Sequence, residues 1–285
     1  MSQPILVFGA LGNVGAEVIK ALQSGGAAVR AADLNPDAIR HRFGESLEAV
    51  HFDFAKAETI TPAVQGVKGM FLMRPPQITD VKRLMFPVID AARTVGVEQV
   101  VFLSLIGIES NRRAPHYKVE QHLRGSGIAW TFLRASFFMQ NLNTIHRAEI
   151  RERNEICVPV GLGKTSFIDV RDIGAVAALA LTQAGHANQA YDLTGSQALD
   201  YYEATEQFSQ VLGRSITYRN LSLLRFVWES LRYGRPLPFT LVMAWLYRKT
   251  RKGMSAQVTG EVQRLLGRPP ISLRQYIEDY RSAWM

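Results

Sequence analysis

The sequence predicts an α/β fold in which helices cover both faces of a doubly wound parallel sheet, followed by a smaller, mostly helical lobe. Three observations predict it. Short apolar runs alternate with helical stretches along the first part of the chain. A glycine-rich loop follows the first apolar run and opens a helix. After about residue 197 the sequence is mostly helical, punctuated by Pro236, Pro238, Pro269 and Pro270.

The elements follow from periodicity and punctuation. Mostly apolar, β-branched runs predict strands at residues 5–8, 27–32, 49–52, 69–72, 99–103, 128–133 and 190–193. Helical spacing of apolar residues predicts helices at 14–22, 81–95, 119–123 and 173–181. Asp172 precedes the last of these helices and is expected to be its N-cap.

Composition narrows the class of protein. The 285 residues are 47% hydrophobic and 20% charged, which is globular composition and excludes a disordered or fibrous chain. The single cysteine, Cys157, cannot form an internal disulfide and cannot build a Cys-rich zinc site. No apolar run reaches the roughly 18–20 residues that span a bilayer, and the N-terminus lacks a basic signal-peptide region. We expect a soluble, cytoplasmic protein without a metal.

Positive charge is concentrated near the C-terminus. Residues 1–209 hold 20 basic and 21 acidic side chains, whereas residues 210–285 hold 13 basic and 4 acidic ones. Such an excess can attract nucleic acid, anionic lipid or an anionic substrate, and residues 248–252 would carry the contact. We favour a solvated helical face, so neither nucleic acid nor an anionic membrane is expected as a partner.

The glycine loop is the strongest functional motif. Gly9, Gly12 and Gly15 have G-x-x-G-x-x-G spacing between a strand and a helix. Without side chains, backbone N–H groups can approach a pyrophosphate at the positive end of the helix. The alternative is a purely structural glycine turn. We predict a dinucleotide site formed by Gly9, Leu11, Gly12, Asn13, Val14 and Gly15.

Asp33 follows the second predicted strand. Its carboxylate can accept hydrogen bonds from the adenosine ribose hydroxyls and would repel a 2′-phosphate, so we expect NAD to be favoured over NADP. Arg40 and Arg42 leave NADP open, and a turn residue is the alternative for Asp33. Asp53 and Phe54, after the third strand, are expected to flank the adenine.

Residues 161–165 read Gly-Leu-Gly-Lys-Thr and imitate the end of a phosphate-binding P-loop. That motif needs a glycine at position 158, where the chain has Val158, and no acidic strand partner is evident. We therefore do not expect a nucleoside triphosphate to bind there.

Together these residues resemble an atypical short-chain dehydrogenase/reductase of the NmrA-like group. That group includes quinone, azo-dye and triphenylmethane reductases and cofactor-sensing regulators without known turnover. The resemblance spans roughly residues 4–215, in segments 9–15, 101–104, 116–120, 126–134, 138–141, 167–173 and 191–195. It implies a Rossmann sheet of order 3-2-1-4-5-6-7 and NAD(P)H as cofactor.

The expected domains follow from this fold. Residues 1–153 and 167–196 are expected to form the NAD(P)-binding domain. Residues 154–166 and 197–285 are expected to form a smaller lobe for a substrate or partner. The ligand cleft is expected between them, at the carboxyl ends of the strands.

The expected catalytic residues depart from the wider superfamily, because the chain has no Tyr-x-x-x-Lys pair. The resemblance places the active site at His116, four residues before Glu120. His116 could contact the nicotinamide ribose or the substrate and move a proton near neutral pH, or simply pair with Glu120. Ser104, which ends the fifth strand, and Lys118 are the other catalytic candidates; only one of Tyr117 and Lys118 can share a site with His116.

The resemblance also assigns contacts to two loops. After the fourth strand, three residues should line the path of the cofactor's ribose and phosphates: Met73, Arg74 and Pro75. After the sixth strand, two residues should approach the nicotinamide: Ser136 and Phe137. An aromatic substrate pocket should be walled by Phe137, Phe138 and Asn141. Core packing is the alternative role of the two phenylalanines.

We therefore predict an NAD(P)H-dependent oxidoreductase that transfers hydride to a quinone-like or other planar, electron-poor small molecule. A quinone can take its proton from water, so the missing tyrosine is tolerable. The alternative is a non-catalytic NAD(P)-sensing regulator that binds a protein partner. The missing pair favours that alternative, as does Leu105, where relatives often have a second serine.

Overall fold

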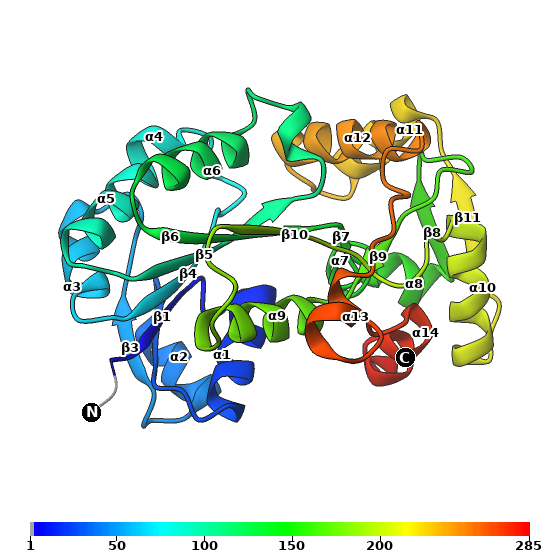
Figure 1. The fold of residues 1–285 in the computed structure, drawn as a ribbon. Coiled ribbons are helices and arrows are strands. Elements are labelled where there is room, and N and C mark those ends of the chain that lie inside the picture. The colour runs from blue at the N-terminus through cyan, green and yellow to red at the C-terminus, as the bar shows by residue number, and fades with distance from the viewer. Residues whose placement is uncertain (1–2) are drawn as a thin grey trace. The chain divides into compact units, whose positions relative to one another are not determined.

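The computed structural model describes residues 3–285 and divides the chain into two compact units (Figure 1). The first unit comprises the chain up to Ala135 together with Val170–Leu193, and the second comprises Ser136–Asp169 and Thr194–Met285. The boundary differs from the expected one, because residues 167–169, 194–196 and 136–153 belong to the second unit. Their helices, α7 (Gln140–Thr144) and α8 (Arg147–Arg153), place Leu142 and Ile150 in the core of that unit.

The first unit is built on a seven-stranded parallel sheet, which confirms the predicted fold class. Its strand order is β10-β6-β5-β4-β1-β2-β3, and this is the predicted order with β10 as the seventh strand. The strands are β1 (Ile5–Phe8), β2 (Val29–Asp33), β3 (Glu48–His51), β4 (Gly69–Met73), β5 (Gln99–Leu105), β6 (Ala129–Ala135) and β10 (Gln189–Leu193).

Helices cover both faces of this sheet, as its apolar strands require. They are α1 (Asn13–Ser24), α2 (Pro36–Phe43), α3 (Ile60–Val64), α4 (Val81–Leu84), α5 (Phe86–Thr94), α6 (Pro115–Gly125) and α9 (Val170–Thr182), with short 3₁₀ turns η1 (Ala57–Thr59) and η2 (Ile108–Ser110). Figure 1 shows α1 and α9 on one face and α4, α5 and α6 on the other. Gly174 lets α9 approach α1 closely, since a Cβ there would lie 2.7 Å from the backbone of Glu17.

Two local predictions are wrong. The helix expected at 81–95 is two helices that meet at Met85, because Pro87 in the first turn of α5 has no N–H to continue the preceding ladder. Helix α9 begins at Val170, so Asp172 lies in its first turn and is not its N-cap.

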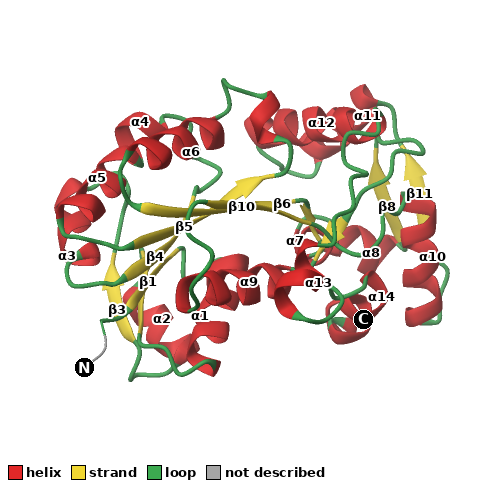
Figure 2. Cartoon of the chain, viewed as in Figure 1, coloured by secondary structure: helices red, strands yellow, loops and turns green. Residues whose placement is uncertain are grey.

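The second unit is mainly helical, as Figure 2 shows, and this confirms the expected helical C-terminal region. Besides α7 and α8 its helices are α10 (Tyr201–Leu212), α11 (Leu223–Arg232), α12 (Leu237–Arg251), α13 (Glu261–Leu266), α14 (Leu273–Asp279) and the 3₁₀ turn η3 (Arg281–Ala283). Two parallel strand pairs were not anticipated. They join β8 (Glu155–Val158) to β11 (Thr217–Asn220) and β7 (Phe137–Phe138) to β9 (Phe167–Ile168).

Each unit has its own apolar core. In the first, buried side chains from the sheet and its helices pack together, among them Phe8, Leu72, Phe102, Val119 and Phe132. In the second, large aromatic residues dominate: Tyr201, Phe208, Tyr247, Tyr276 and Trp284. Burial of each such side chain contributes about 1.5–3 kcal/mol. None of the helices within residues 3–285 is long and apolar enough to cross a membrane.

Candidate functional site

The predicted dinucleotide loop forms a tight turn between β1 and α1. Gly9 has φ +68°, and its N–H donates to the carbonyl of Ala32 at 3.0 Å. A Cβ at Gly9 would lie 2.9 Å from the sulfur of Met73, and one at Gly15 would lie 2.1 Å from the Gly9 carbonyl oxygen. Both positions must therefore remain glycine for the turn to close. Gly12 is exposed, and a Cβ there would lie 3.2 Å from the Gly9 carbonyl oxygen.

The N-terminus of α1 presents unused donors at this turn. Gly12 is the N-cap and provides no side-chain cap, and no acidic residue lies in the first turn. The i→i−4 ladder starts with the Ala16 N–H, which donates to the Gly12 carbonyl at 3.1 Å. The N–H groups of Asn13, Val14 and Gly15 precede that bond, at the positive end of the helix dipole. This cradle fits a pyrophosphate.

Asp33 and Arg42 bracket the loop with opposite charges. The Asp33 carboxylate accepts hydrogen bonds from the Leu11 N–H at 2.9 Å and from the Leu34 N–H at 2.8 Å. Arg42 is exposed, and its guanidinium donates to the Leu11 carbonyl at 2.9 Å. A carboxylate and a guanidinium therefore both reach Leu11, where the ribose of an adenosine would be recognised.

Asp53 and Phe54 follow β3, the strand next to β2. The Phe54 ring packs against Phe52, with centroids 4.7 Å apart, and against Phe8 at 5.9 Å. Asp53 accepts a hydrogen bond from the Ala55 N–H at 2.9 Å. Both residues are half-buried, so each keeps an accessible face beside the edge that carries Asp33.

A buried polar group lies at the carboxyl end of the sheet, and we call it the sheet-edge cluster: Ser104, Glu120 and Arg134. Ser104 on β5 and Arg134 on β6 are in register, with Asp192 of β10 next in line. Ser104 Oγ donates to Glu120 Oε1 at 2.6 Å, and Arg134 binds both carboxylate oxygens of Glu120 at 3.0 and 2.8 Å. Arg134 also pairs with Glu109. The cluster ties α6 to two adjacent strands.

The Glu120 carboxyl titrates near neutrality. Burial raises its pKa to about 7, while the hydrogen bond from Ser104 and the nearby Arg124 act in the opposite direction. Its arginine partner, Arg134, is itself shared with Glu109. Glu120 therefore combines complete hydrogen bonding with a charge that changes near physiological pH.

His116 lies one helical turn before Glu120 and contacts Arg74. Arg74 Nε donates to His116 Nε2 at 3.4 Å, and its Nη1 donates to the carbonyls of Pro75, Pro76 and Ile78 at 3.0, 3.1 and 2.7 Å. Arg74 thus orders the loop after β4. Burial, assisted by Arg74, lowers the pKa of His116 to about 3.

This pKa opposes the expectation that His116 moves a proton near neutral pH. The imidazole is neutral there, and with Nε2 accepting from Arg74 its proton is assigned to Nδ1. Glu120 pairs with Ser104 and Arg134, so these bonds take the place of the alternative pairing of Glu120 with His116. Lys118 is exposed and Tyr117 half-buried, so the structure does not bring Lys118 to this cluster.

The remaining predicted contacts lie in the second unit. Ser136 donates a short hydrogen bond to the carbonyl of Ser166. Phe137 packs edge to face on Phe167, with centroids 5.8 Å apart, which supports a packing role for this ring. Both Ser136 and Phe137 are half-buried.

Phe138 and Asn141 continue the same segment. Phe138 is opposite Ile168 in the β7–β9 pair and is half-buried. Asn141 lies in the first turn of α7, where its carbonyl accepts from the Ile145 N–H at 2.9 Å, and its side chain is half-buried. Ser136, Phe137, Phe138 and Asn141 thus form one continuous segment of the second unit.

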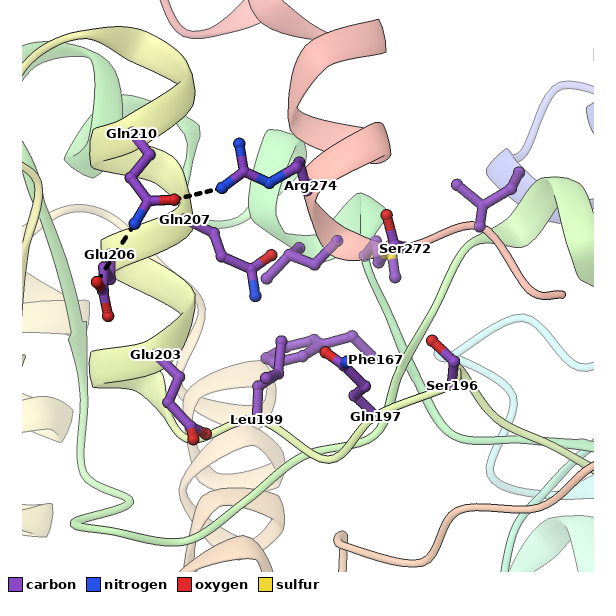
Figure 3. Close-up of a pocket in the computed structure, with 13 residues that line it drawn as sticks. Phe167, Ser196, Gln197, Leu199, Glu203, Glu206, Gln207, Gln210, Ser272 and Arg274 are labelled. Atoms are coloured by element: carbon purple, nitrogen blue, oxygen red, sulfur yellow. Dashed lines mark hydrogen bonds between the residues drawn. The ribbon is translucent and has the colours of Figure 1, made fainter.

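A cavity of about 510 Å³ lies between α10 and α14 in the second unit, and Figure 3 shows its lining. Amide, carboxylate and guanidinium groups converge on it, with Gln210 bridging Glu206 at 3.3 Å and Arg274. Its apolar part is provided by Met139, Phe167, Leu199, Ile271 and Leu273. No predicted site residue lines this cavity. Its polar lining suits a hydrogen-bonding ligand rather than a planar, electron-poor one.

Sequence reasoning did not find the partners of the sheet-edge cluster. Arg134 is the last residue but one of β6, and Asp192 is the last residue but one of β10. A polar residue at the carboxyl end of a buried parallel strand is the signal that could have found them, because all such ends share one edge of the sheet.

The chain is similar to a known protein family and to several named proteins. Residues 1–251 match the model of the NmrA-like family. The chain is 32% identical to an NAD(P)H azoreductase of Xenophilus azovorans, over 98% of this chain and 99% of that protein. It is also 32% identical, with the same coverage, to a (4-alkanoyl-5-oxo-2,5-dihydrofuran-3-yl)methyl phosphate reductase of Streptomyces griseus. Among solved structures, the NADPH complex of the NADPH-dependent quinone oxidoreductase of Escherichia coli has the same fold, with a TM-score of 0.88 and 24% identity over 97% of this chain and 99% of that chain.

Proposed function

The chain belongs to the NmrA-like family, and from that premise we propose that it is an NAD(P)H-dependent reductase that transfers hydride to a quinone-like or other planar, electron-poor acceptor. One observation carries the proposal: the N-terminus of α1 has no side-chain cap and no acidic first turn, and it opens onto the exposed Gly12. Bound NAD(P)H would supply the hydride.

The named relatives support the choice of acceptor. Their names specify an azo compound, an unsaturated oxo-dihydrofuran and a quinone. Each of these is a conjugated group that is electron-poor and accepts hydride. We extend that shared chemistry to this chain, without choosing among the three.

In this proposal the chain's own residues bind the cofactor and hold it and the acceptor in position. The N–H groups at the start of α1 would bind the pyrophosphate. The sheet-edge cluster fixes α6, which carries His116, and Arg74 fixes the loop after β4. We assign neutral His116 the role of a hydrogen-bond donor through Nδ1, toward a ribose hydroxyl or an acceptor oxygen, and leave protonation of the product to water. In the second unit we assign acceptor contacts to Phe138 and Asn141.

We further propose that NADH binds more tightly than NADPH. The Asp33 carboxylate is held at the loop by two backbone N–H groups, where it can accept from the ribose hydroxyls. Arg42 on the same loop would moderate the repulsion of a 2′-phosphate, so NADPH should still bind. Binding of the two cofactors to Asp33→Ser tests this: the preference should shift toward NADPH.

The test of the function is binding followed by turnover. Energy transfer from tryptophan to nicotinamide reports the binding of NADH and NADPH, and a quinone, an azo dye and a triphenylmethane dye are then added in turn. We expect oxidation of many cofactor equivalents with at least one acceptor, and its loss in Gly12→Val. Saturable binding without oxidation by any of these acceptors would overturn the reductase and favour the NAD(P)-sensing regulator. No binding of either cofactor would overturn both.

A further inference from the structure

Exposed apolar side chains gather on one helix pair of the second unit. Among residues 3–285, sixteen large apolar side chains are exposed, and ten of them lie between Leu224 and Met254. That stretch holds α11, a short connection and α12, which pack against each other and run side by side in Figure 1. Single exposed apolar residues are ordinary, but a concentration of this kind marks an interaction surface.

Helix α12 carries apolar side chains on its outward face as well as on its inward one. Its inward face carries two threonines with a methionine and a tyrosine: Thr240, Met243, Tyr247 and Thr250. Its outward face carries Leu241, Val242 and Trp245, which are 53%, 56% and 48% exposed. A helix that only covers a core places its apolar residues inward. The outward stripe therefore has another purpose.

Helix α11 and the start of α12 extend this stripe. Leu224 is 85% exposed and Trp228 is 58% exposed, four residues apart on α11. Leu237, in the first turn of α12, is half exposed. We call the residues Leu224, Trp228, Leu237, Leu241, Val242 and Trp245 the helix-pair surface.

Basic side chains outnumber acidic ones along the stretch that carries this surface, although Arg225 and Arg235 are themselves paired with glutamates. Residues 222–258 contain seven basic side chains and one acidic one, Glu229. Glu229 is buried, where Arg219 and Arg225 bind it. The Lys249 ammonium lies 4.1 Å from the centre of the Trp245 ring, so cationic and aromatic groups are mixed. A solvated helical face, which the charge pattern alone favours, does not explain the apolar side chains.

A basic groove adjoins the C-terminal end of α12. Loop 161–164 packs against it so closely that a Cβ at Gly163 would lie 2.3 Å from the Thr250 carbonyl oxygen. This loop, Arg251 and Lys252 line a cavity of about 600 Å³. Lys164 also lines it, although its ammonium is paired with Glu203 at 3.1 Å. The dimensions and charge suit an anionic head group.

We propose that α11 and α12 form a peripheral docking surface for an anionic lipid bilayer. A bilayer supplies both requirements of the surface, since its acyl boundary accepts leucine, valine and tryptophan while its phosphates pair with arginine and lysine. A second copy docking through the same face would oppose like charges. Nucleic acid would use the cations but leave the aliphatic stripe in water. The proposal goes beyond the reductase activity and does not depend on it.

Vesicle co-sedimentation tests this with the full chain. One vesicle contains equal parts of phosphatidylglycerol and phosphatidylcholine, and the other contains phosphatidylcholine alone. We expect binding to the first at low salt, weakening by about tenfold or more at high salt, and little binding to the second. Tryptophan emission should shift to the blue on binding, because Trp228 and Trp245 are exposed whereas Trp284 is buried.

A matched pair of substitutions localises the effect. Leu241→Glu places a carboxylate in the helix-pair surface, and Leu34→Glu places one at an equally exposed leucine of the first unit. Leu241→Glu should weaken vesicle binding by about tenfold or more, and Leu34→Glu should change it by less than about twofold. Circular dichroism of both variants checks that they remain folded.

Several results would overturn the proposal. These are no binding to the anionic vesicle, equal binding to both vesicles, or equal losses in the two variants. A dimer that Leu241→Glu converts to a monomer, without vesicle binding, would assign the surface to a second copy. Salt-sensitive binding to duplex DNA or to RNA that leaves the vesicles unbound would assign it to nucleic acid. Because none of these readouts uses NAD(P)H, they remain separate from the test of the reductase.

Discussion

Each unit buries a glutamate beside an arginine, and the two carboxyl groups respond in opposite ways. At the sheet edge of the first unit, burial raises the pKa of Glu120 to about 7. Inside the second unit, burial would also raise the pKa of Glu149, but His146 and Arg235 lower it to about 2. Similar burial therefore leaves one group titrating near neutrality and the other firmly ionised.

The difference lies in the groups that face each carboxylate. Glu149 is bonded to His146 Nδ1 at 2.9 Å and to Arg235 Nη2 at 2.8 Å, with Arg153 at 3.8 Å. Glu120 binds Arg134, whose guanidinium also binds Glu109, and the nearby Asp192 opposes the effect of Arg124. A carboxylate surrounded by cations stabilises the fold, whereas one that shares its cation can respond to pH or to a ligand.

The largest effect should come from Glu149→Gln. The substitution leaves His146 and Arg235 buried without their anion, so we expect a loss of about 3–5 kcal/mol in the free energy of unfolding at neutral pH. Urea unfolding of the wild type and the variant measures it. A loss below about 1 kcal/mol would contradict the distinction drawn between Glu149 and Glu120.

The stability of the same variant should also depend on pH differently from that of the wild type. The folded pKa of Glu149 lies below its ordinary value of 4.5, so its contribution is present above pH 4.5 and is lost as the pH falls toward about 2. Glu149→Gln should lack this acid-sensitive part of the stability curve. An unchanged acid slope would contradict the assigned pKa.

The dinucleotide site proposed at the N-terminus of α1 can be tested with a matched pair of substitutions at two N-cap glycines. Gly12 caps α1 in the first unit and Gly260 caps α13 in the second, and both are exposed. Gly12→Val should weaken the binding of NADH and of NADPH about 100-fold, which corresponds to about 2.7 kcal/mol. The valine side chain would occupy the position proposed for the pyrophosphate. Gly260→Val should leave binding within about twofold. Equal losses in the two variants would point to a general loss of folding.

A smaller effect is expected from Arg42→Ala. The guanidinium on the Leu11 carbonyl is the group that would meet a 2′-phosphate, so NADPH should bind about tenfold more weakly. The affinity for NADH should change by less than about threefold, since NADH lacks that phosphate. Titration of both cofactors measures the ratio, and equal weakening of the two would assign Arg42 to the loop's structure instead.

The smallest effect should come from Glu120→Gln. Its folded pKa is raised, so its contribution is fully present below pH 4.5 and is lost as the pH rises through about 7. Glutamine imitates the protonated carboxyl, and we expect a change below about 1 kcal/mol near neutral pH, with a flatter dependence between pH 4.5 and 7. Denaturant unfolding across that range measures it; a loss as large as that of Glu149→Gln would contradict the comparison.

Much of the first unit could be predicted because its signals are local. Apolar runs predicted the strands. The glycine turn predicted that the strand before it is the first strand of a doubly wound sheet. The helix at 81–95 failed because helical periodicity continues through Phe86-Pro87 although the hydrogen-bond ladder does not. The β8–β11 pair was missed because Thr217–Asn220 is a short, mainly polar run with no strand signature of its own.

The candidate site was predicted only in part, for a related reason. The loop residues Gly9, Gly12 and Gly15 lie within one short stretch of the sequence, so their joint role is visible. The bonds of Glu120 to Ser104 and Arg134 depend on strand register, which no short motif encodes. The outward apolar stripe of α12 is likewise visible only once its inward face is known. The functional roles of all the predicted site residues, Lys118, Ser136 and Phe137 included, stay predictions.

The most direct test of the reductase is anaerobic oxidation of NADH and NADPH by the purified chain with menadione as acceptor, followed by nicotinamide absorbance, with Gly12→Val as its control. The account predicts many turnovers per protein molecule, a lower KM for NADH than for NADPH, and loss of the reaction in the variant. Tight cofactor binding with no oxidation above the protein-free rate would contradict it.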